Sequence, residues 1–271
     1  MIRTNLQDKV AVITGAGSGI GRATARAFAA AGARIVACDL DRARVDSLAA
    51  ELGDRMVLAS QVDVSDRAQM AAFADAVHAR IPAADILVNN AGVGLGGSFL
   101  DTSLDDWDWV LGVNLKGVVH GCHYFVPKQV ERGTGGHVIN IASILGIFAP
   151  PKASAYVASK FAVLGLSKSL RSELAPHRIG VTAICPGLIA TAIMEDGRVS
   201  GSLARHQDKI KARFKKGTQP ERVAQAILAA VHTNPAVATV GSDAWVTAAL
   251  ARVAPRVTER IGMLVARRLG H

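Results

Sequence analysis

Short runs of apolar, often β-branched residues alternate along the chain with longer alanine-rich stretches of helical period. Seven runs are expected to form strands, the last more weakly patterned than the others: 9–14, 33–39, 55–63, 84–90, 136–143, 179–187 and 237–241. They lack regular polar/apolar alternation, as expected when helices cover both faces of a parallel sheet. The stretches between them predict helices near 19–31, 41–52, 66–80, 104–132, 155–175 and 219–232.

This order of elements predicts an α/β protein with a doubly wound, mostly seven-stranded parallel sheet and right-handed crossovers. No repeat, low-complexity tract or linker divides residues 1–241, which we expect to form one domain. Residues 188–218 interrupt the alternation with a long, partly irregular and basic insertion. Residues 242–271 form a tail patterned like two short amphipathic helices separated by Pro255, and predict a C-terminal helical extension.

The composition is that of a globular protein, with 50% hydrophobic and 20% charged residues. Lys and Arg exceed Asp and Glu by 31 to 22, a net charge of +9. Such a balance is compatible with nucleic acid, a membrane surface or an anionic substrate as partner. Because no nucleic-acid-binding module is recognised, we expect no nucleic-acid partner and favour a basic soluble protein.

The chain shows neither a signal peptide nor an apolar run long enough to cross a membrane, which predicts a cytoplasmic protein. Its three cysteines, Cys38, Cys122 and Cys185, are far apart in the sequence. They form no metal-ligand pattern and no disulfide framework, so we expect reduced structural thiols and no bound metal.

The first expected strand runs directly into TGAGSGIG, residues 14–21. Gly15, Gly19 and Gly21 allow a tight turn and let the backbone approach a pyrophosphate at the N-terminus of the next helix. The position of this loop in the first βαβ unit favours a dinucleotide-binding loop over a structural turn. Asp39 ends the second strand, where a carboxylate accepts hydrogen bonds from the ribose of NAD and repels the 2′-phosphate of NADP.

Four polar residues further along indicate an active site: Asn114 in the long helix, Ser143 closing the fifth strand, and Tyr156 and Lys160 on one helical face. Oxidation of an alcohol with NAD requires removal of the hydroxyl proton while a hydride leaves the carbon. A neighbouring ammonium and the positive nicotinamide would lower the tyrosine pKa from about 10. We therefore expect Tyr156 to act as general base in oxidation and general acid in reduction, and Ser143 to bind the substrate oxygen.

Each of these residues taken alone is more often structural, but all four in this order behind a nucleotide loop favour catalysis. The T-G-x-x-x-G-x-G loop, NNAG at 89–92, Tyr-x-x-x-Lys and CPGLIAT at 185–191 together resemble the short-chain dehydrogenase/reductase family, over roughly residues 8–241. The resemblance implies a single-domain extended Rossmann fold, alcohol–ketone interconversion, and homodimers or homotetramers built on the helices containing Asn114 and Tyr156. It also implies that Lys160 binds the nicotinamide ribose and that Asn114 supports a water-linked proton relay.

The cofactor-binding set implied by the motifs is Gly15, Ser18, Gly19, Ile20, Gly21, Asp39, Asp63, Val64, Asn90, Ala91, Gly92, Tyr156, Lys160, Pro186, Gly187 and Thr191. NADP-preferring relatives often carry a basic residue where this chain has Ser18. We therefore predict NAD as cofactor, with NADP less favoured, although Arg42 could still reach a phosphate. In the alternative, structural interpretation, Asp39 caps the helix that begins near Asp41.

Mostly apolar segments are expected to line the substrate pocket: VGLGGSF after NNAG, ILGIFAPP after Ser143, and LIATAIMEDGRVS at 188–200. They predict a lipophilic secondary alcohol, a steroid or a hydroxyacyl compound. The basic segment 205–216 leaves open a 3-oxoacyl thioester reductase acting on a carrier- or CoA-bound substrate. A non-catalytic NAD-binding regulator is a further alternative. The tail replaces the usual ending of the family, and we expect it to pack on its own dimer, close the active site or touch a membrane surface.

Overall fold

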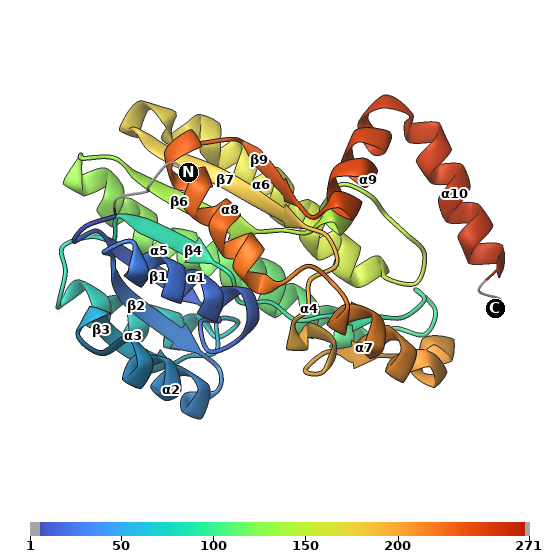
Figure 1. Cartoon of the computed structure of the whole chain (residues 1–271), viewed down its shortest axis with the longest axis horizontal. Coiled ribbons are helices and arrows are strands. Elements are labelled where there is room, and N and C mark those ends of the chain that lie inside the picture. Colours follow the sequence, from blue (N-terminus) through green and yellow to red (C-terminus); the bar gives the residue numbers. More distant parts are fainter. Residues whose placement is uncertain (1–5, 269–271) are drawn as a thin grey trace.

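The computed structural model describes residues 6–268 and contains a seven-stranded, wholly parallel sheet of order β3-β2-β1-β4-β6-β7-β9 (Figure 1). The strand order reverses between β1 and β4, and ligands of such sheets bind at the carboxyl ends of the strands beside this switch point. The predicted doubly wound fold is confirmed. The strands of this sheet are β1 (Val10–Thr14), β2 (Arg34–Asp39), β3 (Met56–Gln61), β4 (Ile86–Asn89), β6 (Gly136–Ile141), β7 (Ile179–Pro186) and β9 (Val237–Val240).

Helices cover both faces of the sheet, with α1, α2 and α8 on one face and α3, α5 and α6 on the other (Figure 1). Short 3₁₀ turns, η1 (Gly53–Arg55) and η4 (Ala175–His177), join helices to strands. The covering helices are α1 (Gly19–Ala30), α2 (Arg42–Leu52), α3 (Arg67–His78), α5 (Gly117–Arg132), α6 (Ser154–Leu174) and α8 (Pro220–Thr233).

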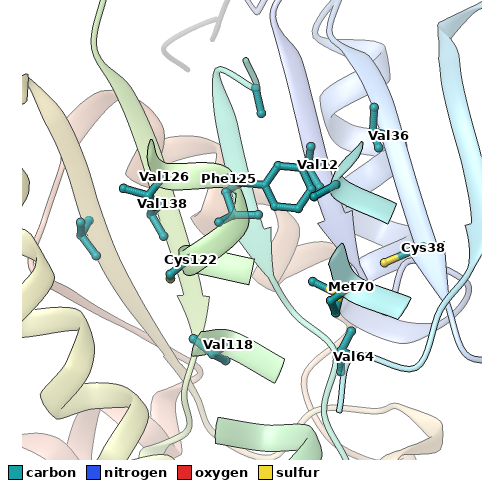
Figure 2. Packing of buried hydrophobic residues seen from close by; sticks show 14 of the residues in the cluster. Val12, Val36, Cys38, Val64, Met70, Val118, Cys122, Phe125, Val126 and Val138 are labelled. Atoms are coloured by element: carbon teal, nitrogen blue, oxygen red, sulfur yellow. The ribbon is translucent and has the colours of Figure 1, made fainter. Parts of the chain in front are cut away.

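Two apolar clusters, one on each face, hold these layers together. Successive residues of β1 point to opposite faces, so Val12 packs in the cluster beneath α3, α5 and α6, and Ile13 in the cluster beneath α1, α2 and α8. Figure 2 shows side chains of the first cluster, among them Met70 and Phe125, gathered against the sheet. Because both faces of each central strand are buried, these strands read as continuous apolar runs in the sequence.

The single helix expected over 104–132 is wrong in one respect, because a π-helical segment divides it. The chain forms α4 (Leu104–Leu111), the π-helical η2 (Gly112–Lys116) and then α5. Gly112 and Gly117 bracket the segment, but apolar residues keep a helical period through the junction, so the sequence did not predict the division. Widened turns of this kind occur frequently at functional sites, and Asn114 lies in the middle of this one.

The insertion and the tail contain the remaining elements. In the insertion, β8 (Arg198–Val199) pairs in parallel with β5 (Leu95–Gly96) among the turns η5 (Ala192–Met194) and η6 (Gly201–His206) and helix α7 (Gln207–Lys215). In the tail, α9 (Ser242–Val253) packs against β9 and η3 (Ile144–Gly146), whereas α10 (Pro255–Arg268) stands away from the body (Figure 1). No described helix is both long enough and apolar enough for a membrane crossing. The division into a domain at 1–241 and a tail stays a prediction.

Candidate active site

The glycine loop leaves β1 and opens at the N-terminus of α1. Gly15 has φ +61°, and a Cβ atom there would lie 2.7 Å from Ala91 Cα, so only glycine fits between the two strand ends. Ser18, the N-cap of α1, makes no side-chain capping bond, and no acidic residue lies in the first turn. Free backbone N–H groups at a helix N-terminus form a site for a pyrophosphate, and this loop therefore fits a dinucleotide.

Thr14 and Asn90 join the end of β1 to the turn after β4. The Thr14 hydroxyl accepts hydrogen bonds from the N–H groups of Asn90 and Ala91, both at 3.0 Å. In return, the Asn90 side-chain amide donates to the carbonyls of Thr14 and Gly15, both at 2.9 Å. Thr14 was not among the predicted site residues, although its place before the first motif glycine is a signal for this role. These bonds hold the glycine loop against the NNAG turn.

Asp39 lies where the motif predicts and is nearly buried. Its carboxylate accepts hydrogen bonds from the N–H of Gly17 at 2.8 Å and from the N–H of Asp41 at 3.0 Å. The cap of α2 is Asp41, which accepts from the N–H of Arg44 at 3.1 Å, so Asp39 is not the capping residue. Arg42 pairs with Asp46 at 2.7 Å along the exposed surface of α2.

Asp63 and Val64 follow β3 at the same edge of the sheet. The Asp63 carboxylate accepts hydrogen bonds from the Ser65 N–H at 2.8 Å and from the Ser65 hydroxyl at 2.7 Å. Val64 is buried, and its carbonyl lies 2.9 Å from Nδ1 of His120 on α5. The structure thus places both residues at the carboxyl ends of the strands, beside the other predicted cofactor residues.

Ser143, Tyr156 and Lys160 meet at the carboxyl end of β6. Ser143 is the N-cap of η3, and its hydroxyl forms a hydrogen bond with Tyr156 of the first turn of α6. One helical turn later, Lys160 Nζ lies 5.7 Å from the centre of the Tyr156 ring and donates to the carbonyl of Ile141 at 3.0 Å. Lys160 and Ser143 are buried, whereas Tyr156 keeps some exposure. The predicted i, i+4 arrangement therefore aims both side chains at one point.

Asn114 connects the π-helical segment to this group. Its side-chain oxygen accepts from the Val93 N–H at 2.8 Å, and its amide donates to the Val93 carbonyl at 3.1 Å and to the Ser159 hydroxyl at 3.2 Å. Ser159 in turn donates to the carbonyl of Tyr156 at 2.6 Å. Sequence reasoning missed Ser159, whose only signal is a small polar residue directly before Lys160. Together these bonds fix the turn of α6 that carries the tyrosine and the lysine.

Burial controls the ionisation of the two central groups. It lowers the pKa of Lys160 to about 8. It also raises the pKa of the Tyr156 phenol, while the hydrogen bond with Ser143 acts in the opposite direction. The predicted lowering of the tyrosine pKa is thus wrong for the protein alone, because desolvation of the phenolate dominates. The positive charge of a nicotinamide, which the prediction also invoked, belongs to the bound cofactor.

The segment after β7 closes the site on the side of the glycine loop. A Cβ atom at Gly19 would lie 3.1 Å from Thr191 Cγ2, so this segment passes directly over the glycine loop. A cavity of about 440 Å³ opens here and is lined by Gly19, Arg22, Ala23, Arg26, Ala190, Thr191, Glu195, Lys215, Gln219, Pro220 and Glu221. The cavity lies beside the glycine loop rather than over Tyr156, at the place where the α1 N–H groups are free.

The first turn of the tail is tied to the same segment. Asp243 on α9 accepts a hydrogen bond from the Leu188 N–H at 2.8 Å, and a Cβ atom at Gly187 would meet its carboxylate. Asp243 lies outside the motifs, and sequence reasoning did not find it. Pro186 and Gly187 therefore connect the end of β7 to the root of the tail as well as to the predicted nicotinamide site.

Comparisons with known proteins agree with this architecture. The family model described as short chain dehydrogenase matches residues 9–200. "Probable oxidoreductase EphD" of Mycobacterium tuberculosis is 42% identical over an alignment of 261 residues, and the match covers 92% of this chain and 44% of that protein, so the chain spans about half the length of this relative. The 3-oxoacyl-[acyl-carrier-protein] reductase FabG of Thermotoga maritima is 36% identical over 82% of this chain and 90% of its own length.

A solved structure gives the same result for the fold. The short-chain dehydrogenase/reductase from Burkholderia phymatum, determined in complex with NAD, superposes with a TM-score of 0.86 at 30% identity, covering 95% of this chain and 96% of that one. The chain belongs to the short-chain dehydrogenase/reductase family of oxidoreductases.

Proposed function

We propose that this protein interconverts a lipophilic secondary alcohol and the corresponding ketone with NAD, and that Tyr156 carries the proton. One observation supports the proposal above the others: Ser143, Tyr156 and Lys160 converge at the carboxyl end of β6, across the switch point from a loop suited to a dinucleotide. NAD, when bound, supplies the acceptor or donor of the hydride.

The proton steps follow from the contacts of these side chains. In oxidation the Tyr156 hydroxyl, as phenolate, takes the proton of the substrate hydroxyl, and in reduction it returns that proton. Ser143 hydrogen-bonds the substrate oxygen and stabilises the charge that develops on it. Within the protein, the hydrogen bond with Ser143 opposes the desolvation that raises the pKa of Tyr156. The Lys160 ammonium, one helical turn away, would also favour the phenolate as a neighbouring positive charge. Asn114, through Ser159, positions the turn that carries both.

The residues that would hold the cofactor line the edge of the sheet on both sides of the switch point. They are Gly15, Ser18, Gly19, Ile20 and Gly21 at the pyrophosphate, Asp39, Asp63 and Val64 at the adenosine, and Asn90, Ala91, Gly92, Tyr156, Lys160, Pro186, Gly187 and Thr191 toward the nicotinamide. NAD is favoured over NADP because the Asp39 carboxylate lies at the ribose end, and because Arg42 is engaged by Asp46. The relative from Burkholderia phymatum was determined in complex with NAD.

Apolar segments around Tyr156 support a lipophilic substrate. Leu95 is buried and packs in one cluster with Tyr156. The segment after β7 reaches the same place, since a Cβ atom at Gly94 would lie 2.8 Å from the Ile193 carbonyl and 3.1 Å from the Met194 sulfur. Burial of an aliphatic substrate against such side chains contributes roughly 25 cal/mol per Å².

A 3-oxoacyl thioester reductase is the second candidate. Two observations favour it: the identity to the Thermotoga maritima reductase, and the exposed cations on and beside α7, among them Lys209, Arg213 and Lys215, which would attract an anionic carrier or coenzyme A. A non-catalytic NAD-binding regulator is less well supported, because the four predicted catalytic side chains are all present and assembled.

The direct test is a screen of NAD reduction over hydrophobic secondary alcohols, steroids and hydroxyacyl thioesters. On the best substrate, Tyr156→Phe is expected to lower turnover by about 10²–10⁴-fold, the usual share of general acid–base catalysis, and to leave the dissociation constant of NADH nearly unchanged. The other tyrosine offers a matched control, since the Tyr124 hydroxyl lies on α5, 3.4 Å from the Arg67 carbonyl and remote from the site. Turnover retained by Tyr156→Phe, or lost in Tyr124→Phe, would contradict the assignment.

A further inference from the structure

Two surface segments with opposite charge expose large apolar side chains. The first, here called the rim, is residues 97–108, where Phe99, Leu100 and Leu104 are 65%, 92% and 82% exposed. The rim contains four aspartates and no Lys, Arg or His. Asp106 pairs with Arg198 at 2.8 Å, whereas Asp101, Asp105 and Asp108 are exposed and form no ion pair with any described residue.

The rim borders the candidate active site. It begins two residues after Leu95, which packs with Tyr156, and its Gly97 N–H donates to the Lys152 carbonyl just before α6 at 2.9 Å. Phe99 leans on Trp107, with the ring centres 6.1 Å apart. Whatever covers the rim therefore lies beside the candidate active site.

The tail, residues 242–271, also exposes apolar side chains, but its charge is opposite to that of the rim. Val253, Val257, Met263 and Leu264 are 84%, 46%, 57% and 57% exposed. The tail carries five arginines against one Asp and one Glu, and among these the exposed Arg252, Arg256 and Arg260 form no ion pair with any side chain that the structure describes. Its root is fixed beside the site by Asp243 and by the packing of α9 against η3, so α9 leads away from the site and α10, which follows it, stands away from the body (Figure 1).

We propose that the tail of one subunit docks on the rim of a second copy of this chain. Opposite charge and matching apolar exposure carry the inference, because an acidic apolar surface and a basic apolar helix bury each other with their charges paired. Within one chain the two segments leave each other exposed. An anionic lipid surface would attract the arginines but repel the aspartates of the adjoining rim, and is the weaker occupant.

The exchange is reciprocal in a two-fold dimer, so each active site gains a wall from its partner. The apolar side chains of that wall would enclose the lipophilic substrate, a consequence that rests on the proposed function. The contact itself does not, and it is tested without substrate or cofactor.

The experiment uses disulfide capture between two differently substituted full-length chains. The native cysteines Cys38, Cys122 and Cys185 are buried and do not interfere. A mixture of Leu100→Cys and Met263→Cys protein is expected to form covalent dimer at least about tenfold faster than a mixture of Asp54→Cys and Met263→Cys, since exposed Asp54 lies outside the rim.

Charge reversal supplies the second arm. The triple change R252E/R256E/R260E placed on the Met263→Cys chain is expected to abolish the capture. Adding D101K/D105K/D108K to the Leu100→Cys chain is expected to restore it, because the reversed tail then meets a reversed rim. Restoration between separate chains supports the exchange and also shows that both variants fold.

Two results would overturn the proposal. The first combines two measurements: equal capture rates in the test and Asp54 mixtures, and an intramolecular disulfide in a single chain that carries both Leu100→Cys and Met263→Cys. Together they would show that the tail covers its own rim. Binding to vesicles of phosphatidylserine that depends on the tail arginines, without capture between chains, would assign the tail to a lipid surface. Neither result bears on NAD binding or on Tyr156, so failure here is distinct from failure of the proposed function.

Discussion

Replacement of Lys160 by methionine should make the free energy of unfolding vary less with pH in the alkaline range. Lys160 is buried, and burial lowers its pKa from 10.5 to about 8. Below pH 8 the ammonium is charged in both the folded and the unfolded chain, and its desolvation opposes folding. Between the two pKa values the folded protein has released a proton that the unfolded chain still binds, so the free energy of unfolding rises with pH and the gain is complete above 10.5.

The lowered pKa corresponds to about 3 kcal/mol of stability gained by the native protein between pH 7 and 10.5. Lys160→Met has no such group, and its long apolar side chain fills similar space. The variant also loses the hydrogen bond to the Ile141 carbonyl, which costs about 1–3 kcal/mol. That cost is independent of the lysine titration and cancels when the two proteins are compared across pH.

The assay is urea unfolding of both proteins at intervals from pH 7 to 10, followed by far-UV circular dichroism. The difference in unfolding free energy between native protein and variant should move in favour of the native protein by about 2.5 kcal/mol as pH rises from 7 to 10. Lys168→Met is the matched control, because Lys168 lies two turns further along α6 and is exposed. A difference for Lys160→Met that stays constant over this range would refute the reasoning.

Three further predictions concern the cofactor loop and the positioning of the site. Asp39→Ala should raise the ratio of kcat/KM with NADP to that with NAD by about tenfold or more, because the carboxylate that repels the 2′-phosphate is removed; an unchanged ratio would contradict this. Asn114→Ala should lower the free energy of unfolding by about 1–3 kcal/mol in urea and lower kcat, because it leaves the Val93 N–H without its acceptor. A variant with native stability and native kcat would exclude a role of Asn114 in positioning the turn that carries Tyr156. Gly15→Ala should weaken NADH binding, measured by fluorescence, by at least about tenfold, because its Cβ would lie 2.7 Å from a backbone atom after β4. Gly53→Ala shares the positive φ without the clash and should bind NADH normally.

The parts of the fold that the sequence predicted are those with a local physical signature. Central strands buried on both faces appear as apolar runs, and the loop at 14–21 is recognisable because tight turns and close backbone approach require glycine. Tyr156 and Lys160 could be placed together because a helix brings residues four apart onto one face. Ser143 was within reach of the same reasoning, since it follows closely after the strand that precedes that helix.

The parts that were missed depend on contacts between distant segments. The π-helical segment arises where Asn114 bonds the turn at Val93, 21 residues earlier, and the helical period alone does not show this. Asp243 bonds Leu188 from the far end of the chain, in a region without a motif. The direction in which the Tyr156 pKa shifts depends on how far packing excludes water from the phenol, and only the folded structure shows this.

The π-helical segment at 112–116 also limits how the length of this chain can vary. A π-helical turn holds more residues than the 3.6 of a regular α-helical turn, so removing one residue from the segment would close the widened turn and displace Asn114 from its present place on the helix. Its hydrogen bonds to Val93 and Ser159, which position the turn that carries Tyr156, would then be broken or strained. Single-residue deletions here should be far less tolerated than deletions in the turn at Gly133, where a side chain would meet nothing within 4 Å. An alignment gap placed inside this stretch would therefore mark a protein whose active site is supported differently.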